Sequence, residues 1–219
     1  MTSRKRIFFI FLNLITTIVI SSHSLAANFS KPAASPKPAQ TTPSPRFIKI
    51  DASGKSMNNA NEDLTWHCVL DNNTGLLWEV KTHDGSLRDA SQTYSWYMLH
   101  PRRNGGFAGY RNQGKCSLAQ CNTQSYIDAI NQKRLCGSIH WRLPTREELR
   151  SIVNYQVKYP GPTIDQRYFP NTRNQFYWSA VPDANDKDSA WGIGFSFGYD
   201  YAYFKSDHGY VRLVSDMQQ

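Results

Sequence analysis

A run of alternating aromatic and small residues between Trp191 and Tyr203 constrains the fold more than any other part of the sequence. Every second position carries a large apolar side chain, and the positions between them carry Gly, Ser, Asp or Ala. Successive side chains of a strand point to opposite faces, so this period of two predicts a β-sheet with one aromatic face. Because a single strand is usually shorter than this run, Gly198 and Asp200 predict a turn inside it.

The rest of the chain predicts an α+β fold. Short strands are expected at 47–50, 66–70 and 76–80, and a closing strand is expected at 210–214. Residues 71–75 predict a tight turn, because Asp and Asn bond locally to the backbone and Gly supplies a positive φ. An order of strands, two helices and further strands is typical of α+β proteins, not of alternating β-α units.

Two helices are predicted in the middle of the chain. Thr123 is placed to cap the first, which should end near Leu135, with Gly137 as its stop signal. Thr145 and Glu148 match a capping box at the start of the second helix. The apolar faces are formed by Tyr126, Ile127 and Ile130 in the first helix and by Leu149, Ile152 and Val153 in the second.

The N-terminal residues predict an exported protein. A short basic start, an uncharged apolar run at 7–20, and small residues at Ser24 and Ala26 together indicate a signal peptide at 1–26. The apolar run is shorter than the roughly 20 residues that a spanning helix needs, so no membrane span is expected after cleavage. Residues 27–46 are rich in Pro and predict an extended linker, followed by one domain at 47–219.

Charge gives little support to a nucleic-acid partner. The chain has a formal net charge of +8 and a pI near 9.4. Six of its 25 basic residues and none of its 17 acidic ones precede Phe47, so the charge from Phe47 onward is only +2. The basic character therefore belongs mostly to the targeting and linker segments, and no nucleic-acid binding is expected.

Four cysteines are present, and an even number in an exported chain predicts two disulfides. Three pairings are possible. We favour Cys116–Cys121 with Cys68–Cys136, because Cys116 and Cys121 lie close together in a loop-like stretch. A zinc site is the alternative, but the chain has no Cys-x2-Cys pair with a nearby pair of histidines, so no metal site is assigned here.

Several short motifs occur in a characteristic order along the chain. They are Trp66-His67-Cys68-Val69, Thr74-Gly75-Leu76-Leu77-Trp78-Glu79, Thr93-Tyr94-Ser95-Trp96, Cys121-Asn122-Thr123, Leu135-Cys136-Gly137, Trp141-Arg142-Leu143-Pro144-Thr145, Tyr168-Phe169-Pro170-Asn171-Thr172, Tyr177-Trp178-Ser179 and Tyr210-Val211-Arg212-Leu213-Val214. The set resembles the bacterial family named after the C-terminal domain of a Legionella collagen-like adhesin (Lcl), over about residues 47–214. Most members have no assigned function. No collagen-like Gly-X-Y tract is present, so the stalk of the namesake and any trimer built on it do not carry over.

The resemblance implies a C-type-lectin-like fold, with small twisted antiparallel sheets, two helices, and first and last strands that lie together. The Arg-Leu-Pro-Thr turn before the second helix also resembles formylglycine-generating enzymes. Those oxidases need a reactive cysteine pair late in the domain, whereas the last cysteine here is Cys136. This departure argues against their chemistry.

The strongest candidate for a ligand site is a stretch of basic sequence. Residues 90–127 contain no Asp or Glu, but they contain Arg102, Arg103, Arg111 and Lys115. Arginine forks suit sulfate and carboxylate groups, so these four residues are predicted to contact an anionic ligand. A solvated surface loop without a ligand is the plainer interpretation.

Two further candidates are less specific. Tyr199, Tyr201 and Tyr203 would stack on sugar rings if they were exposed, although core packing is the more common role of such a stripe. The acidic loop 183–188 contains Asp183, Asn185, Asp186 and Asp188, whose oxygen atoms suit calcium, but its spacing differs from an EF-hand and a solvated loop is favoured.

The sequence favours a non-enzymatic binding or adhesion module, periplasmic or secreted, whose partner is an anionic polysaccharide. No catalytic residue or cofactor is assigned, because the histidines form no HxH or HExxH pattern and no GxSxG elbow is present. A structural or assembly protein of the envelope that binds a protein partner is the alternative. An enzyme of lectin-like fold is a third. The sequence leaves the oligomeric state open.

Overall fold

The computed structural model describes residues 45–57 and 65–216. The predicted signal peptide 1–26 and most of the linker 27–46 lie outside these residues. Within them, no helix is both long and apolar enough to cross a membrane.

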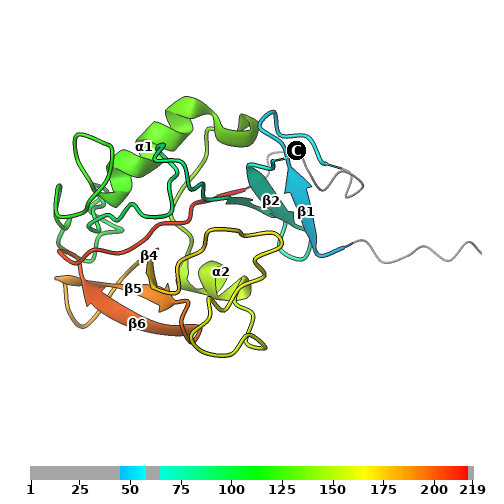
Figure 1. Ribbon diagram of the computed structural model, residues 1–219. Helices are drawn as coiled ribbons and strands as arrows, with labels where there is room; N and C mark the ends of the chain where they lie inside the picture. The colour runs from blue at the N-terminus through cyan, green and yellow to red at the C-terminus, as the bar shows by residue number, and fades with distance from the viewer. Residues whose placement is uncertain (1–44, 58–64, 217–219) are drawn as a thin grey trace, which may run out of the picture. The chain divides into compact units, whose positions relative to one another are not determined.

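The described residues form two antiparallel sheets and two α-helices, so the mixed α+β class is confirmed (Figure 1). One sheet has the order β1-β2-β3-β7 and the other has the order β4-β5-β6. The strands are β1 (Phe47–Ile50), β2 (Cys68–Asp71), β3 (Leu76–Glu79), β4 (Phe176–Pro182), β5 (Ser189–Gly194), β6 (Tyr199–Phe204) and β7 (Val214–Asp216). The helices are α1 (Thr123–Lys133) and α2 (Arg146–Ser151), with a short 3-10 turn η1 (Leu135–Gly137) after α1.

Strand alternation divides the core between the two faces of the four-stranded sheet. Leu77 of β3 packs in one apolar cluster with Tyr126 of α1. Its neighbours Leu76 and Trp78 point the other way, into a second cluster that includes Leu149 of α2. Because both faces are covered, every residue of β3 is buried. Helices α1 and α2 thus pack into different apolar clusters, on opposite faces of the four-stranded sheet.

The turn predicted inside the aromatic run is confirmed. The run divides into β5 and β6, and residues 195–198 connect them. Gly198 has a φ of 77°, and a Cβ atom there would lie 2.5 Å from a side-chain carbon of Val153. Glycine is therefore required by both the backbone conformation and the packing of this turn.

The predicted closing strand is wrong in its position. The last strand, β7, covers Val214–Asp216, whereas the preceding residues run beside other segments through isolated bridges such as Tyr210 to Tyr177. The strands β1 and β7 lie in one sheet, but at opposite edges, separated by β2 and β3. Strand β4 was not among the predicted strands, because its sequence lacks the clear alternation of β5 and β6.

The capping box of α2 is confirmed: Thr145 accepts the amide of Glu148 at 3.1 Å, and the Glu148 carboxylate accepts the amide of Thr145 at 2.7 Å. The boundaries of α1 differ from the prediction. Asn122 is the N-cap, and the left-handed residue at the end is Arg134, not Gly137. The hydroxyl of Thr123, which was predicted to cap the helix, instead donates to the backbone carbonyl of Tyr97 at 2.9 Å. Its side chain therefore makes a tertiary contact and does not cap α1.

Both favoured disulfide pairings are confirmed. Cys68–Cys136 joins β2 to η1 across 68 residues of sequence. Cys116–Cys121 closes a loop of only five residues before α1. The first disulfide thus ties the sheet to the helical segment, and the second fixes a local loop.

Candidate functional site

The predicted basic residues lie on an irregular hairpin formed by residues 93–115, called the basic hairpin below. Its two sides pair through bridges between Thr93 and Lys115 at the base and between Tyr97 and Gly109 nearer the tip. The amide of Met98 also donates to the carbonyl of Ala108 at 2.9 Å, so residues 99–107 form the tip. Backbone pairing therefore positions this segment even though it contains no long strand.

The four cations are all exposed, but they are distributed along the hairpin. Arg102 and Arg103 lie in the tip, Arg111 lies on the returning side, and Lys115 lies at the base. Thr93 and Tyr97 are four residues apart, and an extended chain rises about 3.3 Å per residue, so the two bridges lie about 13 Å apart. The arrangement is a strip and not a compact cluster, which suits an elongated ligand better than a small anion.

Arg111 is the most firmly oriented of the four. Its Nε atom donates to the hydroxyl of Tyr97 at 3.0 Å, and the guanidinium carbon lies 5.4 Å from the centroid of the same ring. Tyr97 is itself buried. The remaining guanidinium N–H groups are left to reach outward, in the fixed fork that suits sulfate or carboxylate oxygens.

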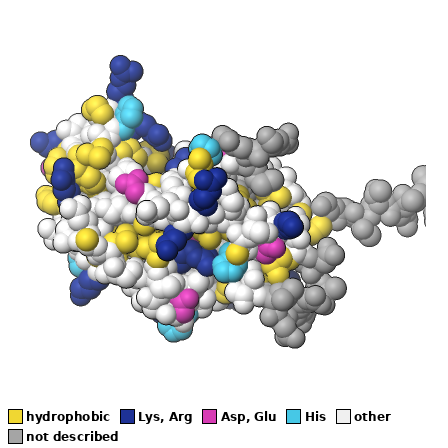
Figure 2. Space-filling view, turned by 90° about the horizontal axis from the view of Figure 1, so that it is seen from above, with side chains coloured by type: hydrophobic (Ala, Val, Ile, Leu, Met, Phe, Trp, Pro, Cys, Tyr) yellow, Lys and Arg dark blue, Asp and Glu magenta, His cyan; other side chains and the backbone are white. Residues whose placement is uncertain are grey.

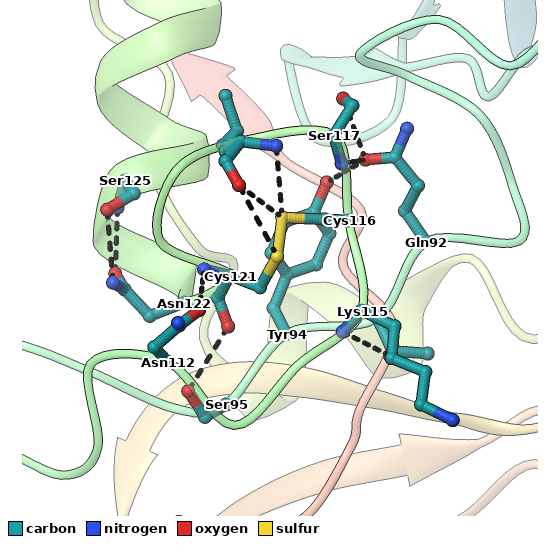
Figure 3. The surroundings of a disulfide bond; sticks show 12 residues. Gln92, Tyr94, Ser95, Asn112, Lys115, Cys116, Ser117, Cys121, Asn122 and Ser125 are labelled. Atoms are coloured by element: carbon teal, nitrogen blue, oxygen red, sulfur yellow. Dashed lines mark hydrogen bonds between the residues drawn. A yellow bond between two sulfur atoms is a disulfide. The ribbon is translucent and has the colours of Figure 1, made fainter.

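The short disulfide braces the base of the hairpin (Figure 3). Next to it, the amide of Cys121 donates to the side chain of Asn112 at 2.9 Å, and the amide of Ser117 donates to Gln92 at 3.1 Å. Figure 3 shows the Lys115 side chain extending away from the disulfide. A polar network thus holds the backbone, and among the described residues no carboxylate pairs with the Lys115 ammonium.

The side chain of Lys205 holds the tip of the basic hairpin in place. Its buried ammonium donates to the carbonyls of Asn104 at 2.9 Å, Phe107 at 2.8 Å and Lys187 at 2.6 Å. It also lies 4.6 Å from the ring centroid of Trp96. Burial lowers the pKa of this ammonium, although Asp188 and Asp186 act in the opposite direction. The basic tip is therefore fastened to the acidic loop 183–188.

The exposed cations of the hairpin have no carboxylate partner among the described residues. Elsewhere arginines form ion pairs with Asp or Glu, namely Arg46, Arg142, Arg146, Arg150 and Arg167. Figure 2 shows Lys and Arg side chains spread over one face of the molecule, with few acidic side chains between them. The hairpin cations are thus available to an external anion.

The acidic loop uses its carboxylates locally. Asp183 accepts the amide of Asn185 at 2.9 Å, and Asp186 accepts both the amide of Asp188 at 3.0 Å and the hydroxyl of Ser189 at 2.7 Å. Within the described ranges, no group of three or more His, Cys, Asp and Glu residues is arranged to hold a metal ion. These contacts explain the acidic loop as a set of tight turns.

The acidic loop also touches the basic tip. A Cβ atom on Gly105 would lie 2.8 Å from the Cβ of Pro182, next to Asp183. We therefore expect the carboxylates of this loop to reduce the positive potential near the tip, which carries Arg102 and Arg103, more than near the base of the hairpin.

The tyrosines of β6 lie on one face of the strand but in different environments. Tyr199 is 65% exposed, and its ring stacks on Phe197 with centroids 6.0 Å apart. Tyr201 packs against the core, whereas Tyr203 is 37% exposed and stacks on Phe176 with centroids 4.2 Å apart. Core packing thus accounts for Tyr201 and for part of Tyr203, but not for Tyr199.

A buried charged network, which no local sequence pattern predicts, lies between β3, α1 and the residues before β7. The carboxylate of Glu79 accepts hydrogen bonds from Lys81 at 3.0 Å, from the hydroxyl of Tyr126, and from the amide of Leu213 at 3.0 Å. Arg212 donates to the carbonyl of Glu79 at 2.6 Å. Burial lowers the pKa of Lys81 and Arg212, and burial with the nearby Glu79 raises the pKa of Tyr126. These groups are at most 4% exposed, so they tie elements together instead of facing a ligand.

The family model of the Lcl C-terminal domain matches residues 67–215. This range covers more than half of the chain. The chain belongs to the Lcl C-terminal domain family. The Lcl match includes the basic hairpin, the acidic loop and β6. It begins at residue 67, after β1, whereas the resemblance was expected to begin near residue 47. No curated protein and no solved structure matches the chain. Membership therefore assigns a family without assigning an activity.

Proposed function

We propose that this Lcl-family protein is a non-enzymatic binding or adhesion module that recognises anionic polysaccharide through the basic hairpin. The observation that carries the proposal is the set of exposed hairpin cations that lack carboxylate partners among the described residues. An unpaired cation can pair with a ligand anion without first breaking an ion pair within the protein.

The shape of the site supports a polymer as the ligand. The cations form a strip about 13 Å or more in length, on a backbone that bridges, a disulfide and Lys205 hold in place. A preorganised strip loses little conformational entropy when it binds, and successive anionic groups of one polysaccharide chain can reach its two ends.

Export to the periplasm or the cell exterior, and a C-type-lectin-like architecture, belong to the same proposal. Two disulfides suit an oxidising compartment, and the combination of two helices with two small antiparallel sheets suits a lectin-like fold.

The alternative is an envelope assembly protein that binds a protein partner. Exposed aromatic side chains favour it, because Tyr159, Phe197 and Tyr199 are each more than half exposed. Rings of this size at a surface often mark protein interfaces. Co-purification with one envelope protein, without salt-sensitive binding to polysaccharide, would favour this alternative.

The proposal is tested by measuring binding of the protein to heparin and to an uncharged dextran across a salt series. We expect heparin binding that weakens as salt rises, and no dextran binding, because exposed charge interactions are screened. Changing Arg102, Arg103, Arg111 and Lys115 to Ala should abolish heparin binding. Changing Lys55, Lys133, Lys158 and Lys187 to Ala removes the same charge from other exposed positions and should leave most of it.

Two double variants locate the contact within the strip. Arg111→Ala with Lys115→Ala should weaken heparin binding more than Arg102→Ala with Arg103→Ala, because the acidic loop lies beside the tip. Equal losses in the basic-hairpin variant and in the matched lysine variant would show nonspecific attraction and contradict the proposal.

A further inference from the structure

The outer edge of the β4-β5-β6 sheet is formed by β6 (Figure 1). The amide of Lys205, just after β6, donates to the carbonyl of Asp188 at 2.7 Å. Antiparallel strands alternate between bonded and non-bonded residue pairs, so the register of β5 and β6 directs the backbone groups of every second residue toward β5. Tyr199, Tyr201 and Tyr203 therefore bond to β5, whereas Asp200 and Ala202 direct their N–H and C=O groups outward.

The opposite edge of this sheet is covered. The outward groups of β4 bond to other segments: the carbonyl of Phe176 accepts the amide of Tyr210 at 2.9 Å, and the amide of Trp178 donates to the carbonyl of Tyr210 at 2.9 Å. The amide of Ala180 donates to the carbonyl of Pro144 at 2.7 Å. The carbonyl of Phe176 and the amides of Trp178 and Ala180 on this edge thus have partners.

The β6 edge lacks such cover. Within residues 45–57 and 65–216, no hydrogen bond reaches the outward backbone groups of Asp200 or Ala202. The next outward residue, Phe204, is capped, because its amide donates to Asp207 at 3.1 Å and its carbonyl accepts the Asp207 amide at 2.8 Å. The open edge is therefore limited to two residues with four backbone groups.

The sequence of β6 lacks most of the features that usually protect an edge strand. It has no Lys, no Pro and an unbroken register with β5. Its one charged residue, Asp200, is neutralised within the subunit by Arg150 at 2.7 Å and Arg146 at 3.4 Å. At the two ends of the strand, Tyr199 and Phe204 are 65% and 60% exposed.

We propose that β6 is a self-association edge, through which two copies of this chain pair antiparallel about a twofold axis at Tyr201. In this register Asp200 exchanges both backbone hydrogen bonds with the partner's Ala202, and Ala202 does so with the partner's Asp200. All four open groups of each copy are satisfied, and the two three-stranded sheets become one continuous sheet.

The side chains complement one another in the same register. Tyr201 lies opposite the partner's Tyr201, and Tyr199 lies opposite the partner's Tyr203, so one face of the interface consists of aromatic pairs. Asp200 lies opposite the partner's Ala202, so no like charges are directly opposed. A register centred on Ala202 would instead place Asp200 opposite the partner's Phe204, whose backbone groups are already bonded. Self-complementarity of this kind is the requirement of a twofold interface.

This inference goes beyond the proposed function and does not depend on it. It assigns the tyrosines of β6 to an interface between copies, in place of the sugar stacking that the sequence suggested as a less common role than core packing. Because association is measured without polysaccharide, failure of one proposal leaves the other standing.

The test is sedimentation velocity over a concentration series. The protein is expressed from its complete sequence and is purified in whatever form the cell produces after any cleavage of the signal peptide. We expect a reversible monomer–dimer equilibrium. Changing Tyr199 and Tyr203 both to Lys, or both to Glu, should raise the dissociation constant by roughly tenfold or more, because each dimer loses two aromatic pairs and gains two pairs of like charges. Mixing the two variants should restore a heterodimer, since Lys then lies opposite Glu.

Two further variants guard against misfolding as an explanation. Ala202→Pro removes an outward N–H group without removing any hydrogen bond within the chain, and it should also weaken the dimer. Ile139→Lys adds charge at another exposed apolar residue, and the dimer should persist. Monomeric wild-type protein at every concentration, a trimer, unchanged association of the edge variants, or a Lys and Glu mixture that stays monomeric would each overturn the proposal.

Discussion

At the scale of single residues, Lys205 is the most unusual side chain of the domain. Buried ammonium groups normally pair with a carboxylate, but each N–H of Lys205 instead donates to a backbone carbonyl. Two of these carbonyls belong to the basic hairpin and one to the acidic loop. One lysine thereby fixes the position of the loop that carries Arg102 and Arg103.

We predict that Lys205→Met lowers the free energy of unfolding by about 2 kcal/mol or more, because three backbone carbonyl oxygens, one of them in a buried hydrogen bond, lose their donor. Urea unfolding measures this loss, and hydrogen exchange should become faster at residues 104–107. The exposed Lys187→Met is the control and should change stability by about 0.5 kcal/mol or less. A loss below about 1 kcal/mol for Lys205→Met would show that the ammonium contributes little beyond its packing.

At the scale of elements, the two disulfides have different tasks. Cys68–Cys136 closes a long stretch of chain and joins β2 to η1, whereas Cys116–Cys121 closes a short loop beside the basic hairpin. Loop-closure entropy grows with the number of residues enclosed, so the long crosslink restricts the unfolded chain more. The short one contributes mainly to the local geometry of the hairpin base.

We predict that changing Cys68 and Cys136 to Ser lowers the free energy of unfolding by about 4 kcal/mol, against about 2 kcal/mol for Cys116 and Cys121. Chemical denaturation measures both changes. Heparin binding at a temperature where both variants are folded should show the reverse order, because only the second change loosens the hairpin. If the variant without Cys68–Cys136 lost more binding, the bracing role of the short disulfide would be wrong.

At the scale of the whole molecule, the two proposals together have a consequence that neither has alone. A dimer through β6 would carry two basic hairpins, and one long polyanion could contact both. Binding of the second hairpin would then be intramolecular, which raises the apparent affinity without any new contact.

We therefore predict that Ala202→Pro weakens binding to a long sulfated polysaccharide by roughly tenfold or more, and leaves binding to a sulfated hexasaccharide unchanged. Fluorescence anisotropy with labelled ligands of the two lengths measures both affinities in solution. Proline adds no charge, so electrostatic effects are controlled. An equal loss for both lengths would mean that the substitution alters the hairpin itself, and no loss would mean that one hairpin binds alone.

Local sequence patterns were sufficient for much of the fold. The period of two at β5 and β6, the capping box of α2 and the short spacing of Cys116 and Cys121 all depend on interactions between near neighbours in the chain. Such interactions are visible in the sequence because the spacing that produces them is fixed by backbone geometry. The same reasoning located the basic hairpin, whose lack of acidic residues is a property of one continuous stretch.

Other features were decided by the tertiary structure. In the sequence, Lys205 resembles an exposed turn residue, and it is buried only because two distant loops close over it. Partners of Glu79 come from α1 and from the residues before β7, which are remote from it in sequence. The edge position of β6 likewise depends on the order in which the strands pair in the sheet. Periodicity determines which side chains share a face, but it carries no information on what covers that face, because the covering atoms come from remote parts of the chain.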